Sequence, residues 1–292
     1  MANKPSFCYD NNRIGDEWMK LNNSAFTEKE IVSILELYEE GFSPQEIAEL
    51  TQLSFQEVLY ILNKKIENLP AEELVSFATI SDEKILIISD THIGSKYENF
   101  EYINEAYNYA LNNGIRTVIH GGDLIQSTID NVQSQYVNQT KQIEHVVEDY
   151  PVHDGFRNYI LLGNHDFQTF KKDSSYLQLL ERRKDFHIMG FKRAYLTWLG
   201  DLISVYHTTK KYHISMPAAY NILSLRGHSH KLSYNKENCI HIPTLSDDLI
   251  MNRDARPGFL VGTKKEDYLT VESLYFTESL HSEGKILTKK LK

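Results

Sequence analysis

The sequence has very few cysteines, which narrows the classes of protein it can belong to. Only Cys8 and Cys239 occur among 292 residues, and no paired spacing links them. A disulfide framework needs several cysteines in an oxidising compartment, and a thiolate zinc site needs closely spaced pairs. The cysteine content therefore argues against both kinds of site and favours a reducing, cytoplasmic location.

Long hydrophobic runs are also missing. No apolar stretch approaches the roughly 20 residues that a membrane-spanning helix needs. Residues 1–7 are polar, and no apolar segment follows them. We therefore expect neither a membrane partner nor a secretory signal. A hydrophobic content of 41% still allows a full-sized core in a chain of this length.

Basic residues are scarce in the first part of the chain. Residues 1–170 hold 11 Lys and Arg against 27 Asp and Glu, whereas residues 171–292 hold 20 against 13. The net charge of −9 thus combines an acidic first part with a basic second part, which would repel a polyanion less. Basic clusters that could guide a nucleic acid, or simply face solvent, are Lys171-Lys172, Arg182-Arg183-Lys184, Lys192-Arg193 and Lys210-Lys211.

Residues 26–70 carry the pattern of a small all-α domain that follows a polar tail at residues 1–25. A hydroxyl residue followed three positions later by Glu marks a helix start. This pattern occurs at Thr27 with Glu30, at Ser43 with Glu46, and at Ser54 with Glu57. The stretch SPQEIAELTQLSFQEVLYIL resembles the helix-turn-helix units of bacterial and phage DNA-binding proteins, and its recognition helix would span residues 55–65.

The charge of this helical domain leaves its role open. Residues 27–66 contain eight Glu but only Lys29, Lys64 and Lys65 as basic residues. Phosphate contacts supply most of the affinity for DNA, and this composition provides few of them. DNA binding and docking of a protein partner are therefore both hypotheses for the domain.

From Lys84 onward, short apolar runs alternate with amphipathic stretches. The pattern predicts strands at 84–89, 116–120 and 158–162, with helices at 100–111 and 136–147. Such alternation is typical of βαβ units in a covered sheet. More closely spaced strands are predicted at 194–198, 202–206, 224–226, 239–242, 259–262 and 268–276. We therefore predict an α/β domain over residues 80–280, with 281–292 as a C-terminal tail.

Five short motifs in this domain contain residue types that commonly serve as metal ligands. They are Asp90-Thr-His92, Gly121-Gly-Asp123, Gly163-Asn164-His165-Asp166, His207, and Gly227-His228-Ser-His230. The first three each follow an apolar strand-like run. Loops after successive strands converge outside the carboxyl ends of a sheet, so these residues can share one site. His120 is expected to pack beside that site as a strand-end residue.

The residue types suit a particular class of metal. Carboxylate, imidazole and amide oxygen together favour Mn²⁺, Fe²⁺ or Zn²⁺ over Mg²⁺ or Ca²⁺. Two such ions about 3.5–4 Å apart can clamp a phosphate and generate a nucleophile from water. The alternative is that the acidic residues and Asn164 only form turns and the histidines only pack. That reading suits each residue alone better than it suits all of them together.

The motifs DTHIG, GGDL, GNHD and GHSH, in this order over residues 90–230, resemble the signature of the calcineurin-like metallophosphoesterases. The resemblance implies a four-layer α-β-β-α sandwich and two divalent metal ions, with Mn²⁺ as the first choice. By this resemblance, Asp123 would bridge the ions and His165 would protonate the leaving oxygen, with Asp166 orienting its ring. The metal ligands would be Asp90, His92 and His230 for one ion, and Asn164, His207 and His228 for the other.

His207 stands in no explicit motif and has only strand context, and His213, six residues later, is a rival for its role. The residues after Asp123 depart from the GD-x-V-D-R-G stretch of phosphoprotein phosphatases. DTHIGS and GGDLI look closer to the DNA-repair nucleases and their phage relatives. The sequence thus predicts a phosphodiester hydrolase, with DNA as the preferred substrate. Small phosphoesters are an alternative, and so is a non-catalytic DNA-binding regulator.

Overall fold

The computed structural model describes residues 27–39, 44–53, 78–127, 138–170, 175–191, 193–207, 222–234, 239–247, 255–277 and 280–291. They fall into two compact units, one containing the N-terminal helices and the other beginning at Ala78. Each unit is described by itself.

The N-terminal unit contains helices α2 (Glu28–Glu39) and α3 (Pro44–Thr51). The first capping box forms as the sequence predicts, because the Glu30 carboxylate accepts from the Thr27 backbone amide at 2.7 Å and the Thr27 hydroxyl accepts from the Glu30 backbone amide at 3.3 Å. Ile34 and Ile47 are fully buried. The tail at 1–25 and the expected recognition helix at 55–65 lie outside the described residues, so the helix-turn-helix unit stays a prediction.

The second unit is built on a seven-stranded mixed sheet in the order β13-β12-β11-β2-β3-β4-β5. Strands β2 to β5 are parallel, while β11 to β13 are antiparallel to their neighbours. The apolar run KILII of β2 is buried from its second residue on, as expected for a strand covered on both faces. The strands are β2 (Lys84–Ile88), β3 (Thr117–His120), β4 (Arg157–Leu162), β5 (Phe186–Phe191), β11 (Gly258–Lys265), β12 (Tyr268–Phe276) and β13 (Leu280–Lys290).

A second sheet of six strands has the order β1-β6-β7-β8-β10-β9. Strands β7, β8 and β10 are parallel to one another, and β6 is antiparallel to β7. Buried and half-buried residues alternate along β6, as expected for a strand with only one face in the core. The strands are β1 (Ala78–Ile80), β6 (Arg193–Trp198), β7 (Asp201–Tyr206), β8 (Leu223–Arg226), β9 (Ser233–Tyr234) and β10 (Cys239–His241).

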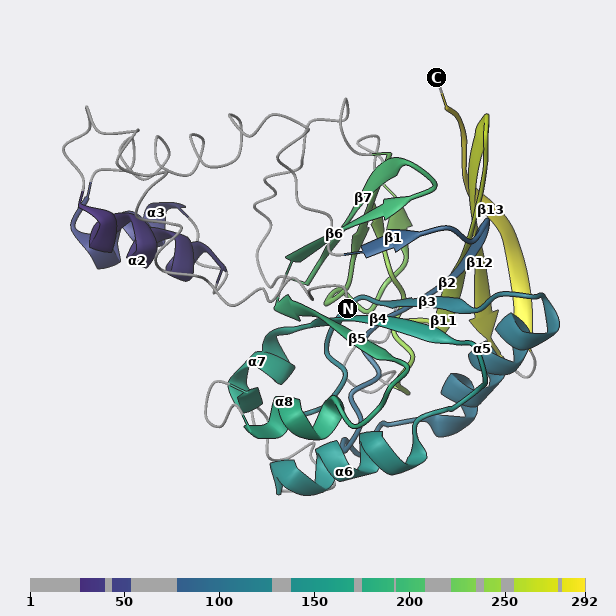
Figure 1. Ribbon diagram of the computed structural model, residues 1–292, viewed down its shortest axis with the longest axis horizontal. Helices are drawn as coiled ribbons and strands as arrows, with labels where there is room; N and C mark the ends of the chain where they lie inside the picture. The colour runs from purple at the N-terminus through teal and green to yellow at the C-terminus, as the bar shows by residue number, and fades with distance from the viewer. Residues whose placement is uncertain are drawn as a thin grey trace, which may run out of the picture. The chain divides into compact units, whose positions relative to one another are not determined.

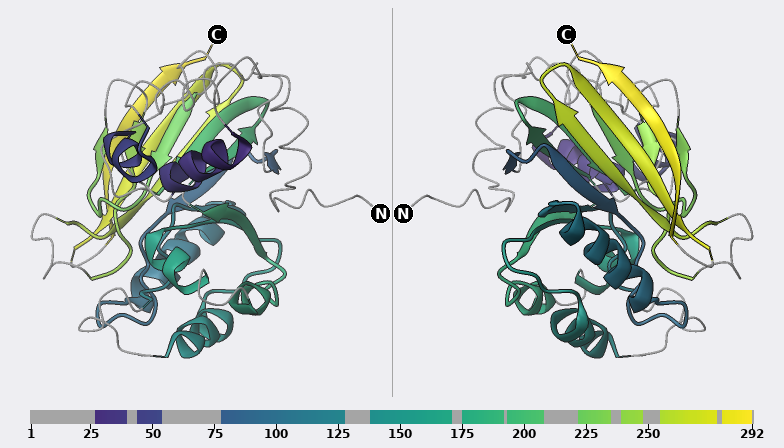
Figure 2. Two further views of the ribbon diagram at one scale, coloured as in Figure 1. Left: turned by 90° about the vertical axis from the view of Figure 1, so that its left-hand side faces the viewer. Right: turned by 90° about the vertical axis from the view of Figure 1, so that its right-hand side faces the viewer.

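Helices cover one face of the seven-stranded sheet, and the second sheet packs on the other face (Figures 1 and 2). The sheets approach so closely that a methyl group added at Gly262 of β11 would lie 3.0 Å from both Ile85 and Trp198. The helices are α5 (Phe100–Asn112), α6 (Gln139–Asp149), α7 (Asn164–Phe170) and α8 (Ser175–Leu180). The predicted α/β sandwich of two mixed sheets is confirmed. The helical layer expected on the outer face of the six-stranded sheet has no member among the described residues of this unit.

The largest difference from the sequence prediction is at the C-terminus. The expected tail at 281–292 is wrong for most of its length, because residues 280–290 form strand β13, which pairs with β12. Most side chains of β13 are exposed and only Leu287 is buried. An edge strand of this kind lacks the apolar alternation by which a strand is recognised in a sequence.

Candidate metal centre

The structure brings the predicted site residues together at the carboxyl ends of parallel strands. Asp90 and His92 follow β2, and Asp123 follows β3. Asn164 and His165 follow β4 and begin helix α7. In the other sheet, His207 follows β7, and His228 and His230 follow β8. Both sheets thus contribute loops to one site.

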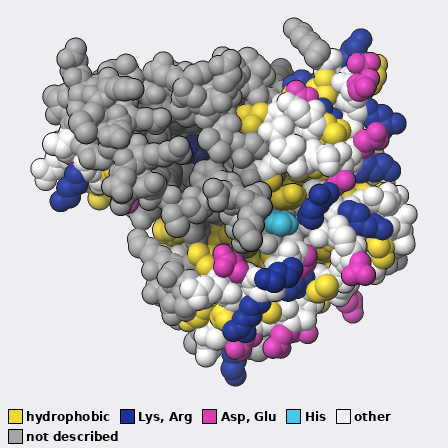
Figure 3. Space-filling model, viewed as in Figure 1, with side chains coloured by type: hydrophobic (Ala, Val, Ile, Leu, Met, Phe, Trp, Pro, Cys, Tyr) yellow, Lys and Arg dark blue, Asp and Glu magenta, His cyan; other side chains and the backbone are white. Residues whose placement is uncertain are grey.

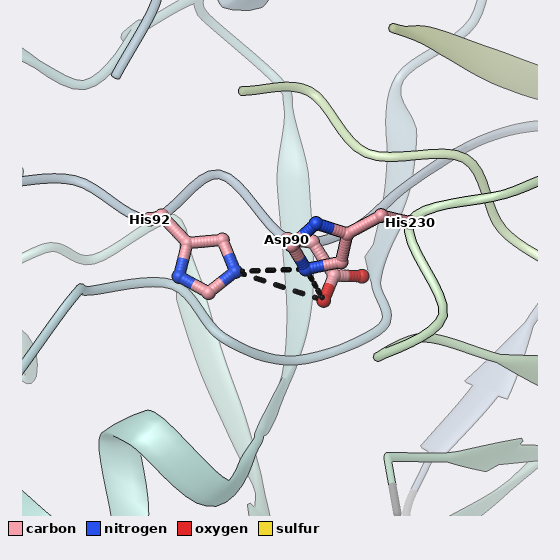
Figure 4. A group of neighbouring side chains, drawn as sticks. All are labelled: Asp90, His92 and His230. Atoms are coloured by element: carbon pink, nitrogen blue, oxygen red, sulfur yellow. Dashed lines mark hydrogen bonds and ion pairs between the residues drawn. The ribbon is translucent and has the colours of Figure 1, made fainter. Parts of the chain in front are cut away.

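One group of donor atoms consists of Asp90, His92 and His230 (Figure 4). The Nε2 atom of His230 lies 3.2 Å from Asp90 Oδ1 and 3.1 Å from His92 Nε2. His92 Nε2 is also 3.9 Å from Asp90 Oδ1. Two imidazole nitrogens and a carboxylate oxygen at these separations could hold one cation.

A second group consists of Asp123, His207 and His228, and a third, which overlaps the other two, joins Asp123 and His92 to His165. Asp123 Oδ2 lies 2.9 Å from His207 Nε2 and 3.9 Å from His92 Nε2, which belongs to the first group. The Asp123 carboxylate therefore lies between the two groups. The His207 Nδ1–H donates to the carbonyl of Gly121 at 2.8 Å, which leaves Nε2 for another interaction.

Several of these atoms are buried but have no hydrogen-bond partner. Asp123 Oδ2 and His207 Nε2 are close enough for an ion pair, yet their orientation does not make a hydrogen bond. Buried polar atoms are normally paired, so a cluster of unpaired ones calls for an explanation. Among the described residues, five of the nine such atoms belong to the expected ligands: His92 Nδ1, Asp123 Oδ2, Asn164 Oδ1, His207 Nε2 and His228 Nδ1. The donor set therefore fits divalent cations, although the ligand role of each residue stays a prediction.

His165 is held differently from the sequence prediction. Its Nδ1 lies 2.6 Å from the carbonyl oxygen of Gln126, which can only accept, so Nδ1 carries the proton. Asp166 instead accepts hydrogen bonds from the backbone amides of Leu124, Ile125 and Gly163 at 3.1, 2.9 and 2.7 Å. The expectation that Asp166 orients the His165 ring is therefore wrong. Asp166 ties the loop after β4 to the loop after β3.

The buried charges shift the pKa values of the site in opposite directions. Burial opposes protonation of His207, but the carboxylates of Asp123 and Asp90 raise its pKa to about 9. Burial and the neighbouring His165 lower the pKa of His92 to about 3. Burial acts to raise the pKa of Asp90, yet His230 and His207 hold it below its usual value. The site thus favours two carboxylates together with positive charge, which a bound cation would supply in place of the His207 proton.

Five of the expected ligands have an unusual backbone conformation. Non-glycine residues seldom adopt positive φ angles, and such residues cluster at functional sites. The φ angles are 54° for Asp90, 44° for His92, 53° for Asp123, 73° for His228 and 56° for His230. This conformation lets the chain turn sharply after each strand and present its side chain to the same point.

Glycines next to the ligands allow close approach. A methyl group at Gly122 would lie 2.2 Å from Nδ1 of His207, and one at Gly163 would lie 2.2 Å from Oδ1 of Asp123. Both glycines therefore occupy places where any side chain would displace an expected ligand.

Sequence reasoning missed the residues that hold the Asp90 loop. The Thr244 hydroxyl donates to the carbonyl of Asp90 at 2.9 Å, and the Leu245 amide donates to the carbonyl of Ser89 at 3.0 Å. Neither residue belongs to a motif named from the sequence. His120 lies beside the site as expected, with its ring 3.1 Å from the Thr91 hydroxyl.

The basic clusters named from the sequence are only partly described. His213 and the clusters Lys171-Lys172 and Lys210-Lys211 lie outside the described residues, as does Lys192. Arg183 is buried, donates to the carbonyls of Tyr150 and Pro151 at 2.9 Å each, and forms an ion pair with Asp185. The expectation that Arg183 guides a nucleic acid is therefore wrong, because its guanidinium is part of the core.

Comparison with known protein families agrees with this geometry. The model of the calcineurin-like phosphoesterase family matches residues 83–275, about two thirds of the chain. The chain belongs to this family. As a calcineurin-like phosphoesterase, it contains in its matched segment all of the expected ligands described above. A comparison with the curated proteins found no match.

Several solved structures are similar to this phosphoesterase. Yfce, a phosphoesterase from E. coli, is 14% identical, with a TM-score of 0.45 over 72% of this chain and 100% of that chain. Vps29 of Entamoeba histolytica, solved with zinc, is 14% identical, with a TM-score of 0.42 over 71% and 98%. The nuclease MPE of Pseudomonas putida is 14% identical, with a TM-score of 0.29 over 55% and 67%. Within the described residues, no helix is long and apolar enough to cross a membrane.

Proposed function

We propose that this phosphoesterase is a two-metal phosphodiester hydrolase and that its substrate is DNA. The observation that carries the two-metal part is the position of Asp123. Its Oδ2 atom lies 2.9 Å from His207 in one donor group and 3.9 Å from His92 in the other. A carboxylate in this position can bridge two ions.

The residues would divide the work as follows. Asp90, His92 and His230 would hold one ion, while Asn164, His207 and His228 would hold the other. When bound, two divalent ions neutralise charge on a phosphate and generate a nucleophile from water near neutral pH. Mn²⁺, Fe²⁺ and Zn²⁺ all suit this mixture of nitrogen and oxygen donors.

His165 would assist the departure of the leaving group. Its backbone amide donates to Asp123 Oδ1 at 2.9 Å and its ring Nδ1–H donates to the Gln126 carbonyl, so one bond holds the backbone and the other orients the ring. The nitrogen left for the substrate is Nε2. In the protonated ring, Nε2 can give a proton to the leaving oxygen.

The choice of DNA as substrate rests on motif resemblance and on the basic second part of the chain. The distribution of charge on the surface gives less support to DNA as the substrate. In the described part of the face shown in Figure 3, Lys and Arg side chains are mixed with Asp and Glu side chains. A nucleic-acid surface is usually a more continuous basic stripe. Hydrolysis of a small phosphoester, such as a nucleotide, is therefore the second candidate.

Three substrates separate the candidates. The purified, Mn²⁺-loaded protein is assayed on linear DNA, bis-p-nitrophenyl phosphate and p-nitrophenyl phosphate, with Asp123→Asn as a metal-site control. The proposal expects hydrolysis of DNA and of the diester, both lost in the control. Activity on the small substrates alone would refute the nuclease. Inactivity on all three, with DNA binding retained, would favour a non-catalytic regulator.

A further inference from the structure

Gln142 is a buried polar residue on helix α6 that none of the sequence motifs includes. Its side-chain amide pairs with both backbone groups of Ser127, in the loop after β3. Oε1 accepts a hydrogen bond from the Ser127 amide at 2.8 Å, and Nε2 donates to the Ser127 carbonyl at 3.2 Å. Gln142 is fully buried, so these bonds form where water does not compete.

The Ser127 amide belongs to the same peptide unit as the Gln126 carbonyl. That carbonyl accepts the Nδ1–H of His165 at 2.6 Å. In a trans peptide, the N–H and C=O bonds point in opposite directions, and the described chain has no cis peptides. Gln142 and His165 therefore lie at opposite ends of one peptide plane. Hydrogen bonds in such a chain polarise and orient one another.

Two further contacts hold this peptide in place. The Thr169 hydroxyl on helix α7 donates to the Ser127 hydroxyl at 2.7 Å. Gln142 also packs against the loop that carries His92, because a methyl group at Gly94 would lie 2.4 Å from Gln142 Cγ. Ser127 itself has a φ angle of 60°, a conformation that the chain adopts rarely without such support.

We propose that Gln142 is a positioning residue for His165. By fixing the peptide between residues 126 and 127, it keeps the Gln126 carbonyl aimed at Nδ1. This bond in turn sets the orientation and tautomer of the His165 ring, with Nδ1 protonated and Nε2 directed to the substrate. The effect of Gln142 on catalysis rests on the proposed function, whereas its effect on the orientation of the His165 ring does not.

The first test measures directly which ring nitrogen of His165 carries the proton. Nitrogen NMR of ¹⁵N-histidine-labelled protein, metal-free and zinc-loaded, separates protonated from unprotonated ring nitrogens, and His165→Ala assigns the signals. In wild type, Nδ1 should be the protonated nitrogen of the neutral ring. Gln142→Met keeps the length of the side chain and removes both bonds, so it should give a mixture of tautomers. Unchanged His165 signals in the folded variant would overturn the proposal.

Matched variants separate positioning from general damage. Thr140→Val is the control, because Thr140 on the same helix gives up a hydroxyl hydrogen bond to Tyr176 at 3.4 Å, outside the contacts that hold the 126–127 peptide. Gln142→Glu keeps an acceptor for the Ser127 amide but puts a second oxygen against the Ser127 carbonyl, so it should restore the wild-type tautomer only when the carboxyl is protonated. If Gln142→Met does not fold, Gln142→Asn replaces it. This variant keeps the amide but withdraws it by one methylene group, so a mixture of His165 tautomers is again expected.

The second test uses the leaving group. A residue that positions a proton donor matters more for a poor alkoxide leaving group than for p-nitrophenolate. Gln142→Met should therefore lower kcat by about 10-fold or more on an alkyl phosphodiester and only about 2-fold on bis-p-nitrophenyl phosphate. Equal losses on both would refute the positioning role. A wild-type protein inactive on both would refute the proposed function, while the NMR result would still decide the role of Gln142.

Discussion

Gly122→Ala should displace His207 and so weaken the second donor group. The added methyl group would lie 2.2, 2.5 and 2.8 Å from Nδ1, Cγ and Cβ of His207. The ring has little room to retreat, because His207 is fully buried and its Nδ1 is bonded to the Gly121 carbonyl. Gly122 also has a φ angle of 112°, which side chains rarely tolerate.

The expected loss of stability has two parts. A Cβ atom at a positive φ angle costs about 1–2 kcal/mol. Overpacking a buried site costs about 1–3 kcal/mol. The free energy of unfolding of the metal-free protein should therefore fall by about 2–5 kcal/mol.

Urea denaturation of the metal-free protein measures this loss, and metal analysis measures the occupancy of the second site. Gly114→Ala is the matched control, because Gly114 has a φ angle of 71° but no atom within 4 Å of the added methyl group. It should show the backbone cost alone and keep both metals. The reasoning is refuted if Gly122→Ala loses no more stability than Gly114→Ala and binds metal normally.

Further predictions concern the site residues themselves. His165→Ala should lose at least about 100-fold in turnover while keeping its metal content, because general acid catalysis contributes at least that much; loss of an ion would show that His165 is a ligand. His207→Ala should lower occupancy of the second metal, and normal occupancy together with a loss in His213→Ala would identify the rival ligand. His207 carries a proton below its pKa of about 9, so metal uptake at pH 8 should release a proton, which calorimetry in two buffers detects; the release should vanish as the pH rises through 9. Because this folded-state pKa is raised from 6.5, His207 stabilises the metal-free protein below pH 6.5, and this contribution is lost as the pH rises through 9. Chelation of the metals should lower the melting temperature, and re-addition of Mn²⁺ or Zn²⁺ should restore it; a melting temperature indifferent to metal would argue against the donor groups as metal sites.

The sequence was sufficient to predict the structure of those parts of the molecule that have strong local patterns. Strand β2 was predicted within one residue, because a buried parallel strand reads as a continuous apolar run. The seven expected ligands were placed in one site because each stands in a short motif or follows a strand. Their division into two groups came from the family resemblance, and the structure places six of them, all but Asn164, in overlapping donor groups.

Other parts depend on contacts that local patterns do not carry. Asp166 was given a role beside His165, but the direction of a side chain at the start of α7 depends on the loop after β3 that it meets. The role of Gln142 was not predicted, because an amide side chain on a helix is usually solvent-exposed. Only the packing of α6 against two loops buries it. Strand β13 was missed because pairing with β12, rather than apolar burial, holds it in the sheet.

The loops of the metal centre concentrate two kinds of unfavourable feature. Asp90, His92, Asp123, His228 and His230 have positive φ angles, each of which costs of order 1–3 kcal/mol. Buried atoms such as Asn164 Oδ1 and His228 Nδ1 lack hydrogen-bond partners, and each such atom costs about 1–3 kcal/mol. Helices and sheets around the site hold these loops in place, because α5 to α8 and both sheets are built from well-buried apolar residues. A bound cation would satisfy the unpaired atoms and offset part of the strain, so metal binding and folding are coupled through the same loops.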